Sequence, residues 1–252
     1  MSKPMKGKVA VVTGGANGIG FATVQRLARE GADIAILDRE EGPLQEAAAF
    51  VKKEGGRALP MAVDMLKPPA VAEAFAKIKK ELGPVDILVN NVGQSARGAS
   101  VELQDSSDDL VEFILAINLT SAMLCSRLVV PDMRARKSGK IVCLSSEAGF
   151  NGTAKMSEYA ASKAGIIGFI RVLATELAPF NVNVNAICPG LTRTRAFDQL
   201  PADMRSEVLA GIPWGRAAEP EEMANVIHFL CSEQSSYVSG HAIVVNGANC
   251  FN

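Results

Sequence analysis

Tyr159 and Lys163 stand four residues apart in the segment Ser157-Glu-Tyr-Ala-Ala-Ser-Lys163. On a helix this spacing places the phenol and the ammonium group on one face. A tyrosine with an ordinary pKa of about 10 becomes a base at neutral pH only if roughly three units, about 4 kcal/mol, are removed. A lysine at about 4 Å supplies energy of that order. The pair could exchange protons, but the spacing also occurs in ordinary helix-surface pairs, so its weight depends on the residues that accompany it.

A glycine-rich turn provides the first of these accompanying features. The run Thr13-Gly14-Gly15-Ala16-Asn17-Gly18-Ile19-Gly20 follows an apolar, strand-like segment and opens a helical one. Glycines let the backbone turn sharply and approach a phosphate, and a helix start offers unpaired N–H groups to a pyrophosphate. The spacing is G-x-x-x-G-x-G, which differs from the better-known dinucleotide fingerprint. The strand-turn-helix context nevertheless predicts a dinucleotide site.

Asp38 ends the next strand-like segment, 24 residues after Gly14. In a dinucleotide fold this position faces the adenosine ribose, and a carboxylate there can accept hydrogen bonds from the ribose hydroxyls. Such a carboxylate repels a 2′-phosphate by ~4 kcal/mol at about 4 Å and an effective dielectric near 20, which favours NAD over NADP. Arg39 is the counter-argument, because it could turn towards a phosphate. Asp38 could also be a solvated residue at a strand end.

The elements that position these residues alternate along the chain. Strand-like runs are expected at Lys8–Thr13, Asp33–Asp38, Arg57–Val63, Val85–Asn90, Lys140–Ser145, Val182–Ile187 and Ala242–Asn246. Helices are expected at Ile19–Glu30, Pro43–Lys53, Pro69–Leu82, Asp105–Arg136, Ser157–Leu177 and Pro220–Cys231. This order predicts an α/β fold with a parallel sheet covered by helices on both faces. The segment 191–217 lacks clear periodicity and is expected to be a movable flap, a loop with a short helix, within a single domain spanning 1–252.

Composition excludes several functions. The formal net charge is −1 at pH 7, with 26 basic and 27 acidic residues, so no electrostatic footprint for nucleic acid or an anionic membrane is expected. The apolar runs, such as Ala164–Ile170, are shorter than a membrane span, and the N-terminus lacks the core of a secretion signal. Five scattered cysteines are interpreted as small buried hydrophobes in a reducing, cytoplasmic setting. His228 and His241 are isolated, so no metal site is expected.

Taken together, these motifs resemble the short-chain dehydrogenase/reductase family over essentially the whole chain. The matching residues are Thr13-Gly14-x-x-x-Gly18-Ile19-Gly20, Asp64, Asn90-Asn91-Val92-Gly93, Asn118, Ser146, Tyr159-x-x-x-Lys163 and Pro189-Gly190. The resemblance implies a Rossmann fold with a doubly wound, seven-stranded parallel sheet, and NAD(P)-dependent chemistry on an alcohol or ketone. Two departures are Val92, where alanine is usual, and Val244-Val-Asn246-Gly-Ala248, where the family commonly has Val-Asp-Gly-Gly. The second could alter assembly or the C-terminal tail.

The resemblance also assigns roles. Tyr159 would exchange the proton of the substrate hydroxyl, Lys163 would lower the tyrosine pKa and hold the nicotinamide ribose, and Ser146 would hydrogen-bond the substrate oxygen. Ser146, thirteen residues before the tyrosine, is preferred to Ser145, for which the alternative is a structural role at the strand end as a cap of the following turn. Asn118 would position a water that links the lysine to solvent, Asp64 would contact adenine, and Thr194 would fix the carboxamide. The full set expected to bind the cofactor is Gly14, Asn17, Gly18, Ile19, Gly20, Asp38, Arg39, Asp64, Met65, Asn91, Gly93, Tyr159, Lys163, Pro189, Gly190, Thr192 and Thr194.

The substrate is constrained less tightly. The resemblance places Gln94, Arg97, Glu147, Asn151, Met156 and Trp214 around the substrate, and their polar character favours a polyhydroxylated alcohol over a bare steroid. The leading hypothesis is an NAD-dependent dehydrogenase acting on a secondary alcohol or ketone. The alternatives are a 3-oxoacyl-thioester reductase and a dinucleotide-sensing binding protein. The first usually uses NADPH and carries basic residues where Asn17, Asp38 and Phe180 stand here, whereas the second typically lacks the tyrosine or the lysine. A homotetramer built on the two longest helices is also expected.

Overall fold

The computed structural model describes residues 3–96, 100–199 and 201–251, and these residues form one seven-stranded sheet. The strand order is β3-β2-β1-β4-β5-β6-β7, and every neighbouring pair is parallel. The strands are β1 Val9–Thr13, β2 Asp33–Asp38, β3 Ala58–Ala62, β4 Ile87–Asn90, β5 Gly139–Leu144, β6 Val182–Pro189 and β7 Ala242–Val245. The predicted doubly wound parallel sheet is therefore confirmed, with each strand within two residues of its expected bounds.

The strands at the centre of the sheet are apolar throughout because both of their faces are covered. All five residues of β1 are buried, as are all four of β4. β1 pairs with β2 on one side, with Val9 opposite Asp33, and with β4 on the other, with Ala10 opposite Ile87. The chain thus adds β2 and β3 on one side of β1, and then crosses over to add β4 to β7 on the other side. Such a reversal leaves a crevice at the carboxyl ends of the two central strands.

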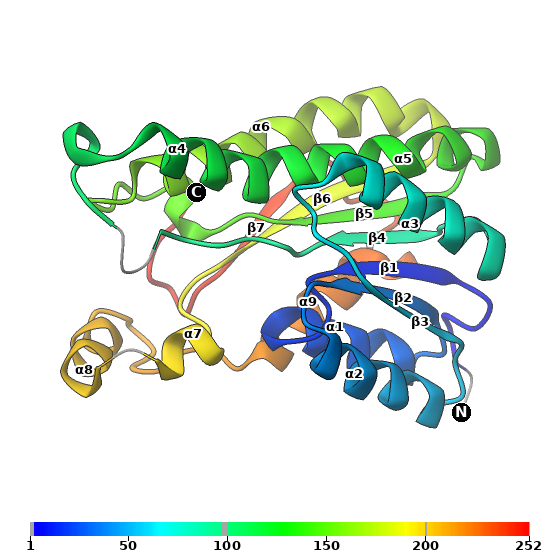
Figure 1. Cartoon of the computed structure of the whole chain (residues 1–252), viewed down its shortest axis with the longest axis horizontal. Coiled ribbons are helices and arrows are strands. Elements are labelled where there is room, and N and C mark those ends of the chain that lie inside the picture. The colour runs from blue at the N-terminus through cyan, green and yellow to red at the C-terminus, as the bar shows by residue number, and fades with distance from the viewer. Residues whose placement is uncertain (1–2, 97–99, 200, 252) are drawn as a thin grey trace.

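Helices cover both faces of the sheet (Figure 1). One layer holds α1, α2 and α9, and the other holds α3, α4, α5 and α6. The helices are α1 Gly18–Arg29, α2 Glu41–Lys53, α3 Pro68–Glu81, α4 Asp108–Leu115, α5 Ser121–Arg136, α6 Ser157–Leu177, α7 Arg195–Asp198, α8 Ala202–Ala210 and α9 Pro220–Cys231. Short 3₁₀ turns are η1 Leu103–Asp105, η3 Glu147–Gly149, η4 Ala178–Phe180 and η5 Glu233–Ser235.

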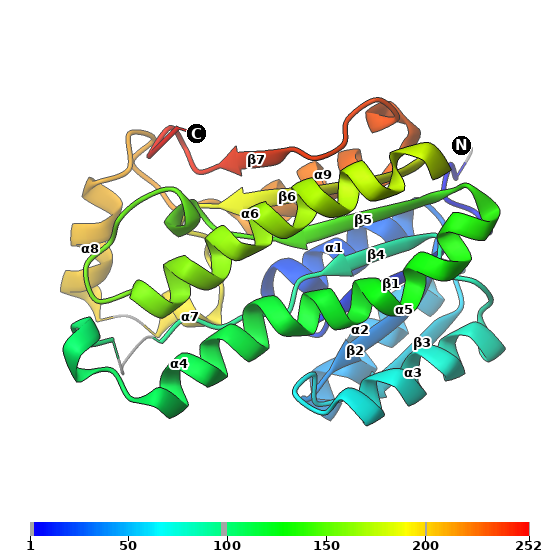
Figure 2. The same ribbon diagram turned by 90° about the horizontal axis from the view of Figure 1, so that it is seen from above.

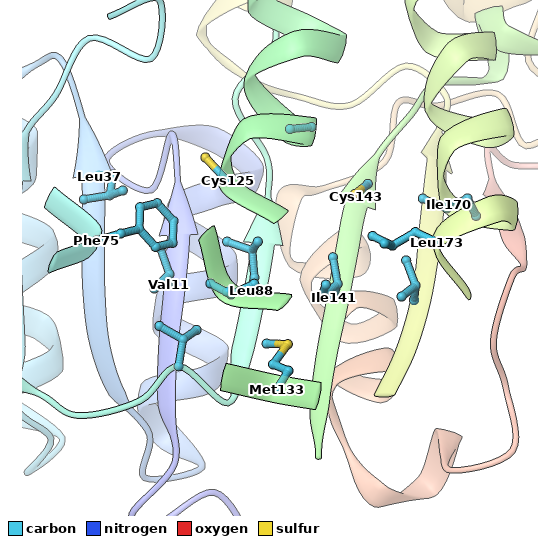
Figure 3. Packing of buried hydrophobic residues seen from close by; sticks show 14 of the residues in the cluster. Val11, Leu37, Phe75, Leu88, Cys125, Met133, Ile141, Cys143, Ile170 and Leu173 are labelled. Atoms are coloured by element: carbon cyan, nitrogen blue, oxygen red, sulfur yellow. The ribbon is translucent and has the colours of Figure 1, made fainter. Parts of the chain in front are cut away.

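Two apolar cores, one on each face of the sheet, hold these layers together. Figure 3 shows the first, where Phe75 of α3, Met133 of α5 and Ile170 of α6 pack onto strand residues such as Leu88 and Ile141. The second core joins α1, α2 and α9 to the opposite face. Burying a side chain of this size stabilises the folded state by about 1.5–3 kcal/mol. The two cores therefore fix the sheet, and with it the edge where the strands end.

The observed structure of the segment Asp105–Arg136 differs from the single long helix that the sequence predicts. It begins at Asp108, because the Ser107 hydroxyl caps it by accepting from the Leu110 N–H at 3.2 Å. A π-helical turn, η2 at Ala116–Thr120, then separates α4 from α5. The continuous stretch Asp108–Arg136 is long and apolar enough to cross a membrane by length and composition alone. Here it lies against α6 and the sheet as a partly buried core helix (Figure 2).

The segment 191–217 contains more regular structure than expected. Two helices, α7 and α8, replace the single short helix that the sequence predicts. Figure 2 shows both helices at the end of the molecule to which the strand arrows point. The segment therefore stands beside the carboxyl ends of the strands, where a substrate flap is expected.

The C-terminal tail leaves β7 through a turn at Asn246, Gly247 and Ala248. Gly247 and Ala248 both have left-handed backbone conformations, with φ values of 63° and 65°. Glycine adopts this conformation freely, whereas a side chain with a Cβ costs about 1–2 kcal/mol. Ala248 thus holds local strain in the segment where the family commonly has glycine.

We expect Ala248→Gly to raise the free energy of unfolding by about 0.5–1 kcal/mol, because relief of the left-handed strain exceeds the extra entropy of an unfolded glycine. Denaturant titration of the two proteins measures the difference. Gly247→Ala is the matched control and is expected to lower the free energy of unfolding. An unchanged or lower stability of Ala248→Gly would contradict the prediction.

Candidate active site

A cavity of about 710 Å³ opens at the carboxyl ends of the strands and collects most of the predicted site residues. Its lining includes Gly14, Asn17, Gly18, Ile19, Asp38, Arg39, Asp64, Met65, Asn91, Gly93, Pro189, Gly190, Thr192 and Thr194 from the predicted cofactor set. It also includes Ser146, Tyr159, Lys163, Gln94, Glu147, Asn151 and Met156. Gly20, Asn118 and Trp214 lie outside this lining, and Arg97 falls outside the described residues.

The glycine turn forms the floor of one end of the cavity. Gly14 and Gly18 have φ values of 62° and 52°, a conformation that favours glycine. Gly20 does not face the cavity, but a Cβ on it would lie 2.0 Å from the Gly14 carbonyl oxygen. Gly20 therefore lets α1 start directly against the turn. Asn17 at the helix start makes no side-chain capping bond, so the first N–H groups of α1 remain available to a pyrophosphate.

Asn91 fastens the turn to the end of β4. Its side-chain amide donates to the carbonyl oxygens of Thr13 and Gly14, each at 2.9 Å. The Thr13 hydroxyl in turn accepts from the main-chain N–H groups of Asn91 and Val92, at 3.0 and 3.1 Å. These bonds tie the two central strands together where the reversal opens the crevice. Asn91 therefore supports the cofactor turn from behind as well as lining the cavity.

Asp38 is held in place by main-chain N–H groups. One carboxylate oxygen accepts from Ala16 at 3.0 Å, and the other accepts from Arg39 at 2.7 Å and Glu40 at 3.2 Å. The carboxylate therefore stands fixed between the glycine turn and the end of β2. This position matches the one at which an adenosine ribose is expected. Arg39 lies exposed at the same end of the cavity.

Sequence reasoning missed a polar cluster beside Asp38. Arg195 of α7 donates to Asn17 at 3.0 Å and pairs with Glu40 at 3.0 Å. Thr194 lies against the glycine turn as well, since a Cβ on Gly18 would come within 3.1 Å of its methyl group. These contacts tie the start of the flap to the cofactor end of the cavity. No sequence spacing signals them, because Arg195 and Glu40 are 155 residues apart.

Lys163 lies at the centre of the cavity wall and is only 3% exposed. Its ammonium group donates to the Leu144 carbonyl oxygen at 2.8 Å and lies 5.7 Å from the centre of the Tyr159 ring. Burial lowers the pKa of Lys163 from 10.5 to about 8, because the charged form loses its water. The side chain therefore still carries its charge at pH 7, close to a half-buried tyrosine that lines the same cavity.

Gly93 lies close to both Asn118 and the Lys163 side chain. A Cβ on Gly93 would lie 2.6 Å from Asn118 Oδ1 and 2.9 Å from the Lys163 ammonium nitrogen, so only glycine fits there. The Asn118 side chain is 1% exposed and saturated: it accepts from the Gln94 N–H and donates to the carbonyl oxygens of Gln94 and Ile114. These bonds make Asn118 a positioning residue that holds the Gly93–Gln94 segment against the π-helical turn.

The two adjacent serines have different surroundings. Ser145 is 4% exposed and donates to the Lys163 carbonyl oxygen at 2.8 Å, which anchors β5 to α6. Ser146 is half-buried in the cavity wall and accepts from the Ala148 N–H at 3.2 Å. The turn-capping role considered for Ser145 therefore falls to Ser146, so that alternative is wrong. The Ser146 hydroxyl can still donate its hydrogen to a substrate oxygen.

The far end of the cavity contains residues from several segments. Glu147, Asn151 and Met156 come from the segment between β5 and α6, as expected. Val208 and Ile212 belong to the flap segment that the sequence places beside the substrate, whereas Asn249 of the C-terminal tail was not singled out from the sequence. Trp214 instead lines a separate hollow of about 720 Å³ beside β7 and the tail, and its side chain is 65% exposed. In this conformation it does not reach the cavity that holds Tyr159.

Four of the five cysteines match their interpretation as buried hydrophobes, whereas Cys250 in the C-terminal tail is partly exposed. Cys125, Cys143, Cys188 and Cys231 are buried thiols, and burial raises their pKa values to about 12, 11, 11 and 12 respectively. Among residues 3–96, 100–199 and 201–251, no group of three or more His, Cys, Asp and Glu side chains could hold a metal ion.

Comparison with known proteins identifies the family. Residues 14–248 match the family model described as enoyl-(acyl carrier protein) reductase. The chain is 36% identical over 243 residues to the 3-oxoacyl-[acyl-carrier-protein] reductase FabG of Thermotoga maritima, covering 96% of this chain and 98% of that protein. It is 34% identical over 246 residues to human dehydrogenase/reductase SDR family member 4, covering 97% and 88%.

Solved structures agree with this assignment. The crystal structure of a short-chain type dehydrogenase/reductase from Mycobacterium marinum superposes with a TM-score of 0.92 and 31% identity, covering 99% of this chain and 98% of the other. The glycine turn, the Ser146–Tyr159–Lys163 cavity and the parallel sheet occur together in one chain. The chain therefore belongs to the short-chain dehydrogenase/reductase family, as an oxidoreductase acting on a carbonyl or alcohol group.

Proposed function

We propose that this protein is an NAD-dependent dehydrogenase that moves a hydride between nicotinamide and a secondary alcohol or ketone, with Tyr159 as the acid and base. The observation that carries the proposal is the placement of Tyr159, Ser146 and the buried Lys163 in one cavity wall. When bound, the nicotinamide supplies or accepts the hydride at the substrate carbon. The protein must then orient the oxygen on that carbon and move one proton.

Each of the three residues has a separate task in this scheme. The Ser146 hydroxyl donates to the substrate oxygen and stabilises the negative charge that develops there. The Tyr159 oxygen gives its proton to that oxygen during reduction and takes it back during oxidation. The Lys163 ammonium, held by the Leu144 carbonyl, stabilises the tyrosinate form through its charge. Asn118 keeps Gly93 against the lysine so that this charge cannot move away.

The cofactor end supports a nicotinamide dinucleotide. The glycine turn and the start of α1 would hold the pyrophosphate, and Asp38 would accept the ribose hydroxyls. Asp64 and Met65 would flank the adenine, and Thr192 and Thr194 would lie beside the nicotinamide. Asp38 and Glu40 together give this end two carboxylates, and the nearest flap cation, Arg195, is already paired with Glu40. Arg39 is exposed in the same lining and could turn towards a 2′-phosphate, so the support for NAD rather than NADP rests on the Asp38 carboxylate, which main-chain N–H groups hold in place.

A second candidate function is reduction of a 3-oxoacyl thioester, which the similarity to the FabG proteins favours. The contacts of this chain weigh against it. Residue 180, where such reductases often have arginine, is Phe180, and its ring lies under the Arg134 guanidinium at 4.3 Å. The carboxylate at position 38 further disfavours the NADPH that those reductases usually use. A dinucleotide-sensing protein is disfavoured because Ser146, Tyr159 and Lys163 are all retained and share one cavity.

We also propose a cytoplasmic homotetramer. Apolar side chains remain on the outer faces of the long helices, with Met123 of α5 46% exposed and Val172 of α6 61% exposed. Further copies of the chain would cover these faces, as the length and apolar composition of Asp108–Arg136 also suggest. Free, buried thiols suit a reducing compartment.

Tyr159→Phe is expected to lower kcat for ketone reduction by at least ~100-fold, because the proton donor is removed while the ring remains. Binding of NADH, measured by fluorescence titration, is expected to change by no more than a few-fold. Tyr237→Phe is the matched control, since Tyr237 is the only other tyrosine and is fully exposed. Equal turnover in Tyr159→Phe and the wild type would refute the assigned acid.

Asp38→Ala is expected to reduce the ratio of kcat/KM with NAD to that with NADP by at least ~10-fold, since repulsion of a 2′-phosphate is lost. Asp38→Asn is the size-matched variant and should move the ratio in the same direction. Steady-state kinetics with saturating substrate and varied cofactor provide the measurement. A wild-type preference for NADP would contradict the proposed cofactor.

The lowered pKa of Lys163 predicts a pH dependence of stability in the cofactor-free protein. Between pH 8 and 10.5 the unfolded chain retains this proton while the folded chain has lost it, so the contribution of Lys163 to the free energy of unfolding rises with pH across this window. A shift from 10.5 to about 8 corresponds to ~3 kcal/mol. The buried cysteines, whose pKa values are raised, give the opposite trend in both proteins, so the free energy of unfolding of the wild type minus that of Lys163→Met should rise across this window, as denaturant titrations at several pH values would measure. Parallel pH profiles would contradict the prediction.

A further inference from the structure

The C-terminal tail contacts the residue that follows Ser146. Asn246 donates its amide to Glu147 Oε2 at 2.9 Å, and Asn249 donates to the same oxygen at 3.1 Å. The Asn246 amide also donates to the Cys250 carbonyl oxygen at 3.1 Å, which closes the tail into a compact turn. Two neutral amides thus fix one oxygen of Glu147. The tail forms part of the cavity wall, because Asn249 lines the same cavity as Glu147.

Packing beneath this contact is close. A Cβ on Gly190, which follows β6, would lie 2.6 Å from the Asn246 Cβ and 3.2 Å from Glu147 Oε2. Glycine at position 190 therefore lets the tail reach Glu147. An aspartate at position 246, the residue that the family commonly has there, would put a second carboxylate against Glu147. The asparagine of this chain replaces that repulsion with a hydrogen bond.

The second oxygen of Glu147 is open. Within the described residues no donor bonds to Glu147 Oε1 and no cation forms an ion pair with the carboxylate. The side chain is half-buried and lines the cavity next to Ser146. Ser146 and Glu147 both line this cavity, so a small molecule bound there can meet the Ser146 hydroxyl and the Glu147 carboxylate together. Ser146 faces the reacting oxygen, and Glu147 can accept a hydrogen bond from a group beside it.

We propose that Glu147, held by Asn246 and Asn249, is a specificity-determining residue that selects substrates with a hydroxyl next to the reacting carbon. The substrates are then α-hydroxy ketones and, in the reverse direction, vicinal diols. This inference rests on the proposed function, because it concerns the substrate of the same cavity. Asn246 and Asn249 act as positioning residues that aim the carboxylate.

Charge gives the selection its direction. In a partly dry cavity, a hydrogen bond from a substrate hydroxyl to a charged acceptor is stronger than the bond that the same hydroxyl makes to water. The substrate binding constant is expected to rise by roughly 10-fold or more. The same carboxylate repels a substrate that carries its own carboxylate. The bound hydroxyl keeps its proton and takes no part in the reaction. Only the neighbouring carbonyl changes, as its carbon gains a hydride and its oxygen gains the Tyr159 proton.

The test compares matched ketones with the wild type and Glu147→Gln, each with saturating NADH and, in parallel, NADPH. The substrates are 1-hydroxybutan-2-one, butan-2-one and 2-oxobutanoate, and a ring pair of 2-hydroxycyclohexanone and cyclohexanone. In the wild type, kcat/KM for each hydroxy ketone should exceed that of its parent ketone by roughly 10-fold or more. Glu147→Gln should bring this ratio close to one and raise kcat/KM for 2-oxobutanoate several-fold.

Two further variants separate selectivity from folding. Glu176→Gln removes the same charge from the exposed far end of α6 and should leave every ratio unchanged. The double variant Glu147→Gln/Asn246→Asp exchanges the amide and the carboxylate. The hydrogen bond between the tail and residue 147 is kept, but the negative charge now belongs to residue 246. Hydrogen exchange of residues 246–251 should match the wild type in this double variant, whereas the hydroxyl selectivity should remain lost.

The outcomes are distinguishable. Reduction of hydroxy and parent ketones with equal kcat/KM in the wild type, or a ratio unchanged in Glu147→Gln, would overturn the role of Glu147 while the proposed function stands. Recovery of hydroxyl selectivity in the double variant would also overturn it, because the contact alone would then suffice. If neither cofactor supports reduction of any of these ketones, the proposed function itself fails and this inference fails with it.

Discussion

The buried ammonium group of Lys163 is the interaction on which the candidate site depends. Removing a charge from water is costly, and the lowered pKa of this lysine expresses that cost. The protein retains the charge by offering the Leu144 carbonyl oxygen at the end of β5. The same strand end anchors α6, because the Ser145 hydroxyl donates to the Lys163 carbonyl. One strand terminus therefore fixes both the lysine and the helix that carries Tyr159.

Parallel strands make this arrangement possible. All seven strands end at the same edge of the sheet, so residues from β1, β4, β5 and β6 meet there although the chain separates them widely. The reversal of strand order between β1 and β4 leaves room for a cofactor at that edge. Apolar cores pack against both faces of the sheet and stabilise this edge, and Figure 3 shows one of the two. Ser146 then follows directly after a strand end held by this core, and Tyr159 and Lys163 stand on the helix α6 that packs against it.

The sequence predicts the parts of this structure that depend on local pattern. Continuous apolar runs such as Val9–Thr13 predict buried strands, and the glycine spacing together with Tyr159 and Lys163 predicts the cavity. The π-helical turn at Ala116–Thr120 was not predicted, because it inserts into a stretch whose composition suits an ordinary helix. The contact of Arg195 with Glu40 and the position of Trp214 were also missed. Each depends on how the flap folds back over the sheet, which no local spacing encodes.

The contact between the C-terminal tail and Glu147 also could not be predicted from local sequence spacing. It shows what a single departure from the family pattern does in the folded chain. Asn246 stands out in the sequence only as a change of residue type, and its partner lies 99 residues away. In the folded chain the change removes one of two negative charges that would otherwise face each other beside Ser146. Carboxylates then remain at two places in the cavity lining, Asp38 beside the glycine turn and Glu147 beside the tail, and the buried Lys163 ammonium belongs to the same lining. Under the proposed function, an uncharged substrate rich in hydroxyl groups meets no repulsion from Glu147, whereas an anionic substrate is repelled by it.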